Sequence, residues 1–128
     1  MKLGTALIGG KDVLVAALDD TTAITLDAAY TACGLGTAPT SLNALIEAGQ
    51  PEMEKVAKAI AASGADFDTL AIADIEFRPP QPRPSKFIGV AMNNRGIRKE
   101  AHKSPTVPNY FLKAPSCLTG HRHPIIMK

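Results

Sequence analysis

Short runs of β-forming residues open the chain and alternate with residues typical of turns. Leu3–Ile8 and Val13–Leu18 are two such runs, and the segment between them, Gly9–Asp12, has the composition of a hairpin turn. A third run, Ala23–Leu26, follows an Asp-Asp turn. This pattern predicts a β-meander in the N-terminal part of the chain.

The apolar residues that follow change to a helical spacing. Ser41 is a candidate N-cap and Gly49 a candidate C-cap, so the segment between them predicts a first helix. Pro51 suits the first turn of a second helix, which we expect to stop at Gly64. One face of this second helix would be apolar through Met53, Val56, Ala57 and Ile60.

A proline-rich connector divides the chain. Thr69–Ile75 has the composition of a strand, and residues 78–85 follow it with four of the 10 prolines. Proline removes backbone donors and favours an extended path, so we expect a semi-rigid linker. A ligand for a proline-binding module is the alternative, which we favour less because one such run between two regions that read as folded is typical of a linker.

Beyond the connector, three short runs predict strands: Lys86–Ala91, Tyr110–Lys113 and Pro124–Met127. The sequence stops inside the third run, so we expect the folding unit that starts near Lys86 to be incomplete. Unpaired strand edges of an incomplete β domain recruit other chains, and we therefore expect a homo-oligomer.

The sequence as a whole predicts an α+β fold with mixed or antiparallel strands. We expect three parts: a small N-terminal domain with a β-meander and two helices (residues 1–77), a linker (78–85) and the beginning of a larger β-rich domain (86–128).

Charge is distributed unevenly along the chain. Residues 78–128 hold ten of the 14 Lys and Arg residues but one of the 12 Asp and Glu residues. A basic segment can attract nucleic acid, a membrane or an anionic substrate, or it can pack on an acidic surface. We favour the last two and expect no nucleic-acid partner, because the basic residues are dispersed and carry no nucleic-acid motif.

Apolar stretches, the N-terminal residues and the cysteines indicate the cellular compartment. No stretch approaches the roughly 18 apolar residues that span a bilayer, so we expect no membrane partner. Polar residues at 9–12 interrupt the N-terminal apolar run before it could act as a signal peptide. Cys33 and Cys117 lie far apart, as expected for unpaired thiols. We expect a cytoplasmic protein.

Three segments after the connector resemble one enzyme family. Pro84–Asn93 contains a proline, a lysine, a small apolar strand, a glycine and an asparagine, in the order found at the opening of the catalytic domain of the fumarylacetoacetate hydrolase family. Pro108–Gly120 is similar to that family's pattern of Pro, Phe-Leu-Lys, Pro, Ser and Gly, and Pro124–Ile125 to its following Pro-Ile. The meander and helices resemble the small leading domain that many members carry.

The resemblance implies a metal-dependent enzyme. Members break a carbon–carbon bond in β-diketo acids, or decarboxylate or isomerise related 2-oxo acids, with Mg²⁺ or Mn²⁺ held by carboxylates. In the family, these carboxylates lie downstream of the position that matches Lys128. The resemblance therefore implies that this chain binds no metal by itself and acts only with the remainder of the catalytic domain or with a partner chain that supplies it.

The family's proton-transferring pair is a His with a Glu three residues further on. Glu100 matches the Glu, but Ile97 stands at the His position and cannot transfer a proton. His102 lies two positions after Glu100, and a shifted loop could bring it into the vacant catalytic role. The alternative, a solvated surface histidine, is the one we favour.

Three other residues are candidates for binding the substrate. Asn93 matches the family's Asn. Arg95 opens a basic cluster within residues 95–103 that could attract the carboxylates of a dioic acid, although a solvated loop explains the cluster equally well. Lys113 matches a family position at a strand end, where it would meet the substrate or a structural carboxylate.

Two further alternatives stay open. His121 and His123 would point the same way on a strand and could bind a transition metal, but we favour an exposed turn. The chain could also be a catalytically inactive binding or oligomerisation module derived from the family, since Ile97 replaces the family's His.

Overall fold

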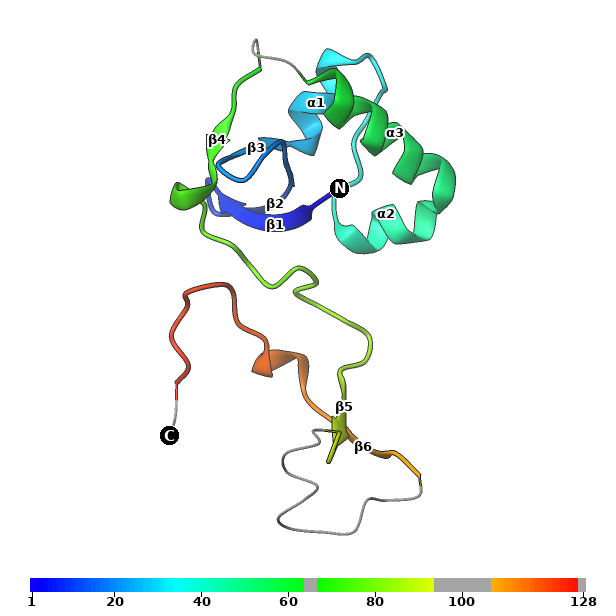
Figure 1. Ribbon diagram of the computed structural model, residues 1–128, viewed down its shortest axis with the longest axis vertical. Coiled ribbons are helices and arrows are strands. Elements are labelled where there is room, and N and C mark those ends of the chain that lie inside the picture. The colour runs from blue at the N-terminus through cyan, green and yellow to red at the C-terminus, as the bar shows by residue number, and fades with distance from the viewer. Residues whose placement is uncertain (64–66, 94–106, 127–128) are drawn as a thin grey trace. The chain divides into compact units, whose positions relative to one another are not determined.

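The structure is a computed structural model that describes residues 1–63, 67–93 and 107–126. The chain divides into two compact units. The first unit consists of Met1–Pro82 and Thr119–Lys128, and the second of Arg83–Leu118. Within the described residues, the first unit contains a curled four-stranded antiparallel sheet and three α-helices, and the second contains a two-stranded sheet (Figure 1). The predicted α+β class is confirmed, and the predicted domain limits stay a prediction.

The sheet of the first unit has the strand order β1-β2-β3-β4. Its strands are β1 (Leu3–Ile8), β2 (Lys11–Ala17), β3 (Thr22–Thr25) and β4 (Leu70–Ala71). The meander is present, but its first turn is tighter than expected, because Ile8 already pairs with Lys11. Gly9 and Gly10 make this turn with φ angles of 56° and 76°, which a residue without a Cβ adopts at little cost.

Helix α1 (Leu26–Ala32) follows β3 directly, where the sequence pattern predicted a strand as far as Leu26. Thr25 ends the strand and caps the helix, because its side-chain oxygen accepts a hydrogen bond from Ala28 N at 3.2 Å. The buried residues of α1 are Leu26, Ala29 and Tyr30. Their spacing of three and one is helical, so it is the sequence signal that marks this element.

The two predicted helices are present as α2 (Leu42–Ala48) and α3 (Gln50–Ala62). Ser41 caps α2, since its Oγ accepts a hydrogen bond from Ala44 N at 3.1 Å. Gly49 separates the helices with a φ of 76°, so the chain changes direction there.

Helix α3 begins with Pro51 in its first turn, as expected, and its C-cap is Ser63. The predicted stop, Gly64, lies outside the described residues. Val56 is buried, and Met53 and Ile60 are half-buried against the core, as expected for the apolar face of α3. Ala57, which we expected on this face, is exposed, and Ala59 is buried in its place, because three and four residue steps from Val56 and not one keep a side chain on the same helical face.

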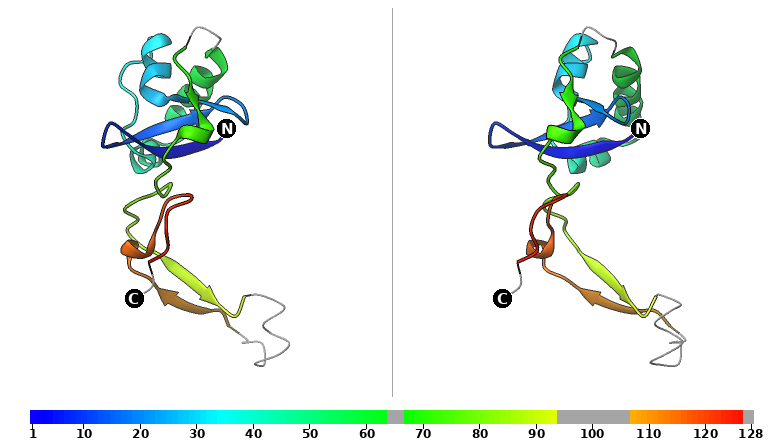
Figure 2. Two further views of the ribbon diagram at one scale, coloured as in Figure 1. Left: turned by 90° about the vertical axis from the view of Figure 1, so that its left-hand side faces the viewer. Right: turned by 60° about the vertical axis from the view of Figure 1, so that its left-hand side comes forward.

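The three helices gather on one side of the sheet (Figures 1 and 2). The largest fully buried side chains of the core between them are Tyr30, Ile24, Leu26, Leu45 and Val56. Full burial of one such apolar side chain stabilises a fold by about 1.5–3 kcal/mol. Because these residues come from β3 and from all three helices, their burial is what joins the helices to the sheet.

The predicted strand Thr69–Ile75 is wrong in extent. β4 has only two residues, after which the chain forms a 3₁₀ turn, η1 (Ile72–Asp74). Two backbone hydrogen bonds then join it to β1: Leu7 N to Glu76 O at 2.9 Å and Arg78 N to Thr5 O at 2.8 Å. The bend at η1 brings residues 76–78 to the edge of β1 opposite β2. Backbone groups of that edge therefore have hydrogen-bond partners, and the sheet curls towards this segment.

The start of the predicted linker packs on this sheet. Thr5 Oγ1 donates a hydrogen bond to Pro80 O at 2.9 Å. Pro80 therefore belongs to the first unit, and the change of unit falls after Pro82, still within the predicted linker.

The second unit is built on a hairpin of β5 (Ile88–Ala91) and β6 (Asn109–Leu112), which pair antiparallel. Both predicted strands are present, although β5 starts after Phe87 and β6 ends before Lys113. A 3₁₀ turn, η2 (Pro115–Cys117), follows β6.

The third predicted strand, Pro124–Met127, is wrong for its described part. Residues 124–126 form no strand, and Met127 lies outside the described residues. Pro124 offers no backbone donor, and apolar composition alone does not make a strand where no neighbouring strand pairs with it.

Candidate functional site

Asn93 and Lys113, two of the predicted substrate-binding residues, lie at opposite ends of the β5–β6 hairpin. Asn93 follows the end of β5, whereas Lys113 N donates a hydrogen bond to Phe87 O at 2.8 Å, just before β5 begins. The distance from Phe87 to Asn93 along an extended chain is on the order of 20 Å. The hairpin therefore does not bring these two side chains into one site.

The Lys113 side chain contacts an aromatic ring of the hairpin. Its Nζ lies 5.9 Å from the centroid of the Phe111 ring, within cation–π range. The ring in turn covers Gly89 on the paired strand, where a Cβ would come within 2.7 Å of Phe111 Cε1. The absence of a side chain at Gly89 leaves the space for the ring. Lys113 therefore packs on a ring that the hairpin holds in place, and because the lysine is exposed, its ammonium group could also contact a ligand.

The remaining predicted site residues cannot be placed. Arg95, Glu100 and His102 lie outside the described residues, as does Ile97. The catalytic roles of Glu100 and His102 and the substrate-binding role of Arg95 stay predictions.

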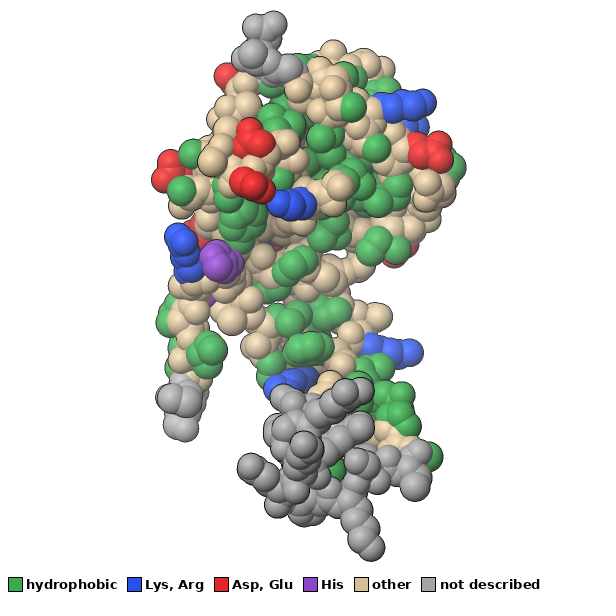
Figure 3. Space-filling view, in the orientation of Figure 1, with side chains coloured by type: hydrophobic (Ala, Val, Ile, Leu, Met, Phe, Trp, Pro, Cys, Tyr) green, Lys and Arg blue, Asp and Glu red, His purple; other side chains and the backbone are tan. Residues whose placement is uncertain are grey.

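One face of the hairpin is apolar and exposed. Ile88 pairs with Leu112 and Val90 with Tyr110, so these four side chains share a face. They form what we call the hairpin face, and each of them is at least 40% exposed. Figure 3 shows that hydrophobic side chains reach the molecular surface. Two strands alone are marginally stable in water, so this face favours a covering partner.

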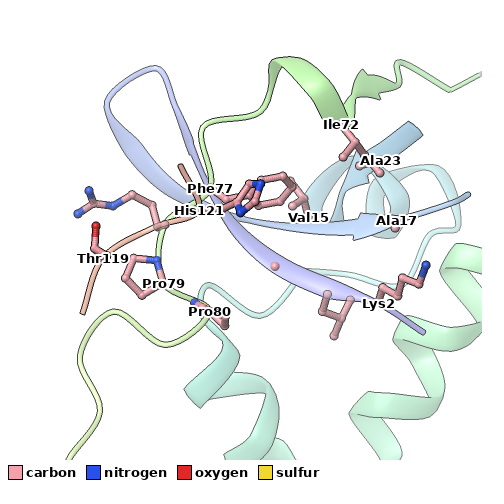
Figure 4. Close-up of a pocket in the computed structure, with 13 residues that line it drawn as sticks. Lys2, Val15, Ala17, Ala23, Ile72, Phe77, Pro79, Pro80, Thr119 and His121 are labelled. Atoms are coloured by element: carbon pink, nitrogen blue, oxygen red, sulfur yellow. The ribbon is translucent and has the colours of Figure 1, made fainter. Parts of the chain in front are cut away.

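A pocket of about 340 Å³ opens on the sheet of the first unit (Figure 4). Val15, Ala17 and Ala23 contribute to its lining, whereas their strand neighbours Ala16 and Ile24 belong to the helical core. Because successive side chains of a strand point to opposite faces, the pocket lies on the face that the helices do not cover. No sequence pattern marked this site, since its lining comes from segments far apart in the chain.

His121 and His123 lie at a turn and have different neighbours. His121 lines the pocket on the sheet, while His123 Nε2 lies 3.3 Å from Glu76 Oε1. The turn approaches the sheet closely, and Gly120 allows this because it has no Cβ. A Cβ at this position would clash with the backbone of Phe77. This geometry is that of a turn packed beside residues 76–77 and not of the strand on which the two imidazoles would have pointed the same way.

The family resemblance places the carboxylates for Mg²⁺ or Mn²⁺ downstream of Lys128, so the metal of the complete enzyme stays a prediction. Among them, no group of three or more His, Cys, Asp or Glu side chains could hold a metal ion. The described part of the second unit, residues 83–93 and 107–118, also contains no Asp or Glu.

Two titratable side chains of the first unit are strongly perturbed. Hydrogen bonds from Thr22 and Thr21 hold the pKa of the Asp19 carboxyl well below its usual range. Burial, together with the hydrogen bond to Glu52, raises the pKa of Tyr30 to about 12. Asp19 lies in a turn and Tyr30 in the helical core. We therefore attribute both pKa shifts to contacts that stabilise the fold and not to a functional site.

The sequence matches no protein-family model and no curated protein. None of the helices formed by the described residues has the length and the apolar content that crossing a membrane requires.

Proposed function

We propose that this chain is part of a fumarylacetoacetate-hydrolase-like enzyme of the cytoplasm that acts on 2-oxo or β-diketo acids by cleavage, decarboxylation or isomerisation. The observation that carries the proposal is the order and spacing of three motifs, within Pro84–Asn93, Pro108–Gly120 and Pro124–Ile125. It is supported by the pairing of the first two motifs as neighbouring strands, β5 and β6, of one hairpin.

The residues of this chain would bind and position the substrate. Asn93 follows β5, at the end of the hairpin where strand ends commonly carry binding residues, and Arg95 would attract a substrate carboxylate. Glu100, with His102 in a shifted loop, would move the proton. The acidic residues for Mg²⁺ or Mn²⁺ would come from the remainder of the catalytic domain or from a partner chain.

The first test is the intact mass and the native mass of the protein from its natural source. We expect a longer polypeptide, or a tight partner chain rich in carboxylates, and metal-dependent loss of acylpyruvate absorbance from that assembly. Within it, loss of turnover in His102→Ala, with turnover kept in His121→Ala, a matched change outside the second unit, would assign the catalytic role to His102. A bare 128-residue species that turns over no acylpyruvate with either metal would overturn the proposal.

A catalytically inactive binding or oligomerisation module is the second candidate. The exposed hairpin face favours it, because four apolar side chains in contact with water are typical of an interaction surface. Replacement of the family's His by Ile97 also supports it. A stable assembly of 128-residue chains, without turnover and without response to metal, would decide for this candidate.

A further inference from the structure

The pocket on the curled sheet combines an apolar floor with basic groups. Val15, Ala23 and Phe77 form part of the floor, and the first two are almost fully buried. The Phe77 ring lies across Gly4, where a Cβ would be 3.3 Å from Phe77 Cε1. Figure 4 shows Lys2 at one end of the lining and Thr119 at the other, with Val15 and Phe77 between them.

The charge of this lining is opposite to that of the surrounding unit. Residues 1–77 contain 11 of the 12 acidic residues of the chain and four of its 14 Lys and Arg residues. The described residues that line the pocket nevertheless include Lys2, Arg78 and His121 and no Asp or Glu. Lys2 and Arg78 are each paired with a carboxylate beyond the lining, Asp20 and Asp12, so an anion here would compete with these partners. The lining itself holds no acidic residue to repel it, which favours an anion here over other parts of the same acidic unit.

Two of the basic side chains are able to meet a ligand. Lys2 Nζ lies 2.9 Å from Asp20 Oδ1, but both side chains are more than 75% exposed, so this ion pair contributes little and is readily exchanged. Arg78 Nε lies 3.3 Å from Asp12 Oδ1, a distance that makes an ion pair. This Nε is buried and has no hydrogen-bond acceptor among the described residues, so a ligand would meet the other nitrogens of the guanidinium, on a side chain that is 40% exposed.

We propose that this pocket binds a small organic acid with an apolar body, an aromatic or branched-chain carboxylate. The apolar body would cover Val15, Ala17 and Phe77, and the carboxylate would accept hydrogen bonds from the basic groups of the lining. A volume of about 340 Å³ suits a ligand of this size. This site is separate from the predicted reaction site, whose residues belong to the second unit, so the inference does not rest on the proposed function.

Phenylacetate and its neutral counterpart phenylacetamide are suitable probes of the full chain. Titration followed by ¹H–¹³C NMR of the methyl groups should show saturable shifts at Val15, Ala17 and Ala23. We expect phenylacetate to bind with a millimolar or lower Kd and about fivefold more tightly than the amide. Absence of saturable shifts at these methyl groups, or equal affinity for the two probes, would overturn the proposal.

Two variants separate the apolar and the charged contributions. Ala17→Leu places a larger side chain in the pocket and should weaken phenylacetate binding about tenfold or more, whereas Ala57→Leu on the exposed side of α3 should leave it unchanged. Lys2→Gln should weaken binding of the carboxylate and not of the amide. Unchanged carboxylate affinity in both pocket variants would show that the shifts arise elsewhere. Wild-type selectivity for the carboxylate needs no variant and tests the proposal even if Ala17→Leu fails to fold.

Discussion

Asp19 organises the turn between β2 and β3. Its Oδ1 accepts hydrogen bonds from Thr21 N at 2.7 Å and Thr22 N at 2.8 Å, and its Oδ2 accepts one from Thr22 Oγ1 at 2.6 Å. All of these donors favour the charged carboxylate, which is why its pKa lies below the usual range. A single ionised side chain thus sets the entry into β3.

The Asp19 carboxylate should make stability depend on pH in the acid range. Because its folded-state pKa is depressed, its contribution is present above the unfolded pKa and is lost as pH falls below it towards the folded value. We expect Asp19→Asn to lower the Tm at neutral pH and to reduce the loss of stability on acidification, measured by circular dichroism. Asp20→Asn, a neighbouring exposed carboxyl, is the matched control. An equal effect of both variants would contradict the assignment.

Tyr30 should act in the alkaline range. Its hydroxyl donates to Glu52 Oε1 at 2.9 Å, and its pKa is raised from 10.0 to about 12, first by burial and then by Glu52. A raised pKa means that the contribution to stability is present below pH 10 and is lost as pH rises through the folded value.

Two variants test this behaviour of Tyr30. The chain has two tyrosines, so Tyr110→Phe isolates the phenolate absorbance of Tyr30, which should appear near pH 12 or on alkaline unfolding. Tyr30→Phe should cost about 1 kcal/mol of unfolding free energy at neutral pH through the lost hydrogen bond. A phenolate that forms near pH 10 in the folded Tyr110→Phe variant would contradict the burial of Tyr30.

At the scale of elements, the cap of α2 is the most direct prediction. Ser41→Ala removes the acceptor for Ala44 N, and because α2 has only seven residues it should lose about 1 kcal/mol of stability. Urea denaturation measures this change, with Thr40→Ala at the exposed neighbouring position as the control. A loss from Ser41→Ala no greater than that of the control would show that packing alone holds the helix.

Elements with local signals were predictable, and elements made by distant contacts were not. Ser41, Gly49 and Pro51 mark the ends of α2 and α3 in the sequence, and the structure uses all three. The strand predicted for Thr69–Ile75 failed because its composition does not reveal the bend at η1. That bend serves the pairing of residues 76–78 with β1, some 70 positions away in sequence.

At the scale of the whole molecule, the hairpin face is where we expect another copy of the chain to bind. Leu112 is 76% exposed on this face, and Leu112→Arg should convert the expected homo-oligomer to a monomer by placing a charge in the apolar interface. Native mass spectrometry or light scattering measures the change. Ile46→Arg is the control, since Ile46 is 70% exposed on α2. An oligomer that persists in Leu112→Arg would place the interface elsewhere.

The predicted site also combines features that local sequence reveals with features that it does not. Asn93 and Lys113 were chosen by their positions in motifs, and each indeed lies just beyond a strand end. Antiparallel pairing puts them at opposite ends of the hairpin, which the order of the motifs does not reveal. The pocket lined by Lys2, Phe77 and His121 had no sequence signal at all, because no local pattern joins them.

The sequence by itself determined the α+β class, the meander, the capped helices and the uneven charge, because hydrophobic spacing and cap residues act over a few neighbouring positions. Tertiary structure alone decided the bend at η1, the curl of the sheet and the pocket on its open face. These features depend on which distant backbone groups satisfy one another, as Thr5 and Arg78 do, and short-range pattern carries no record of such pairings.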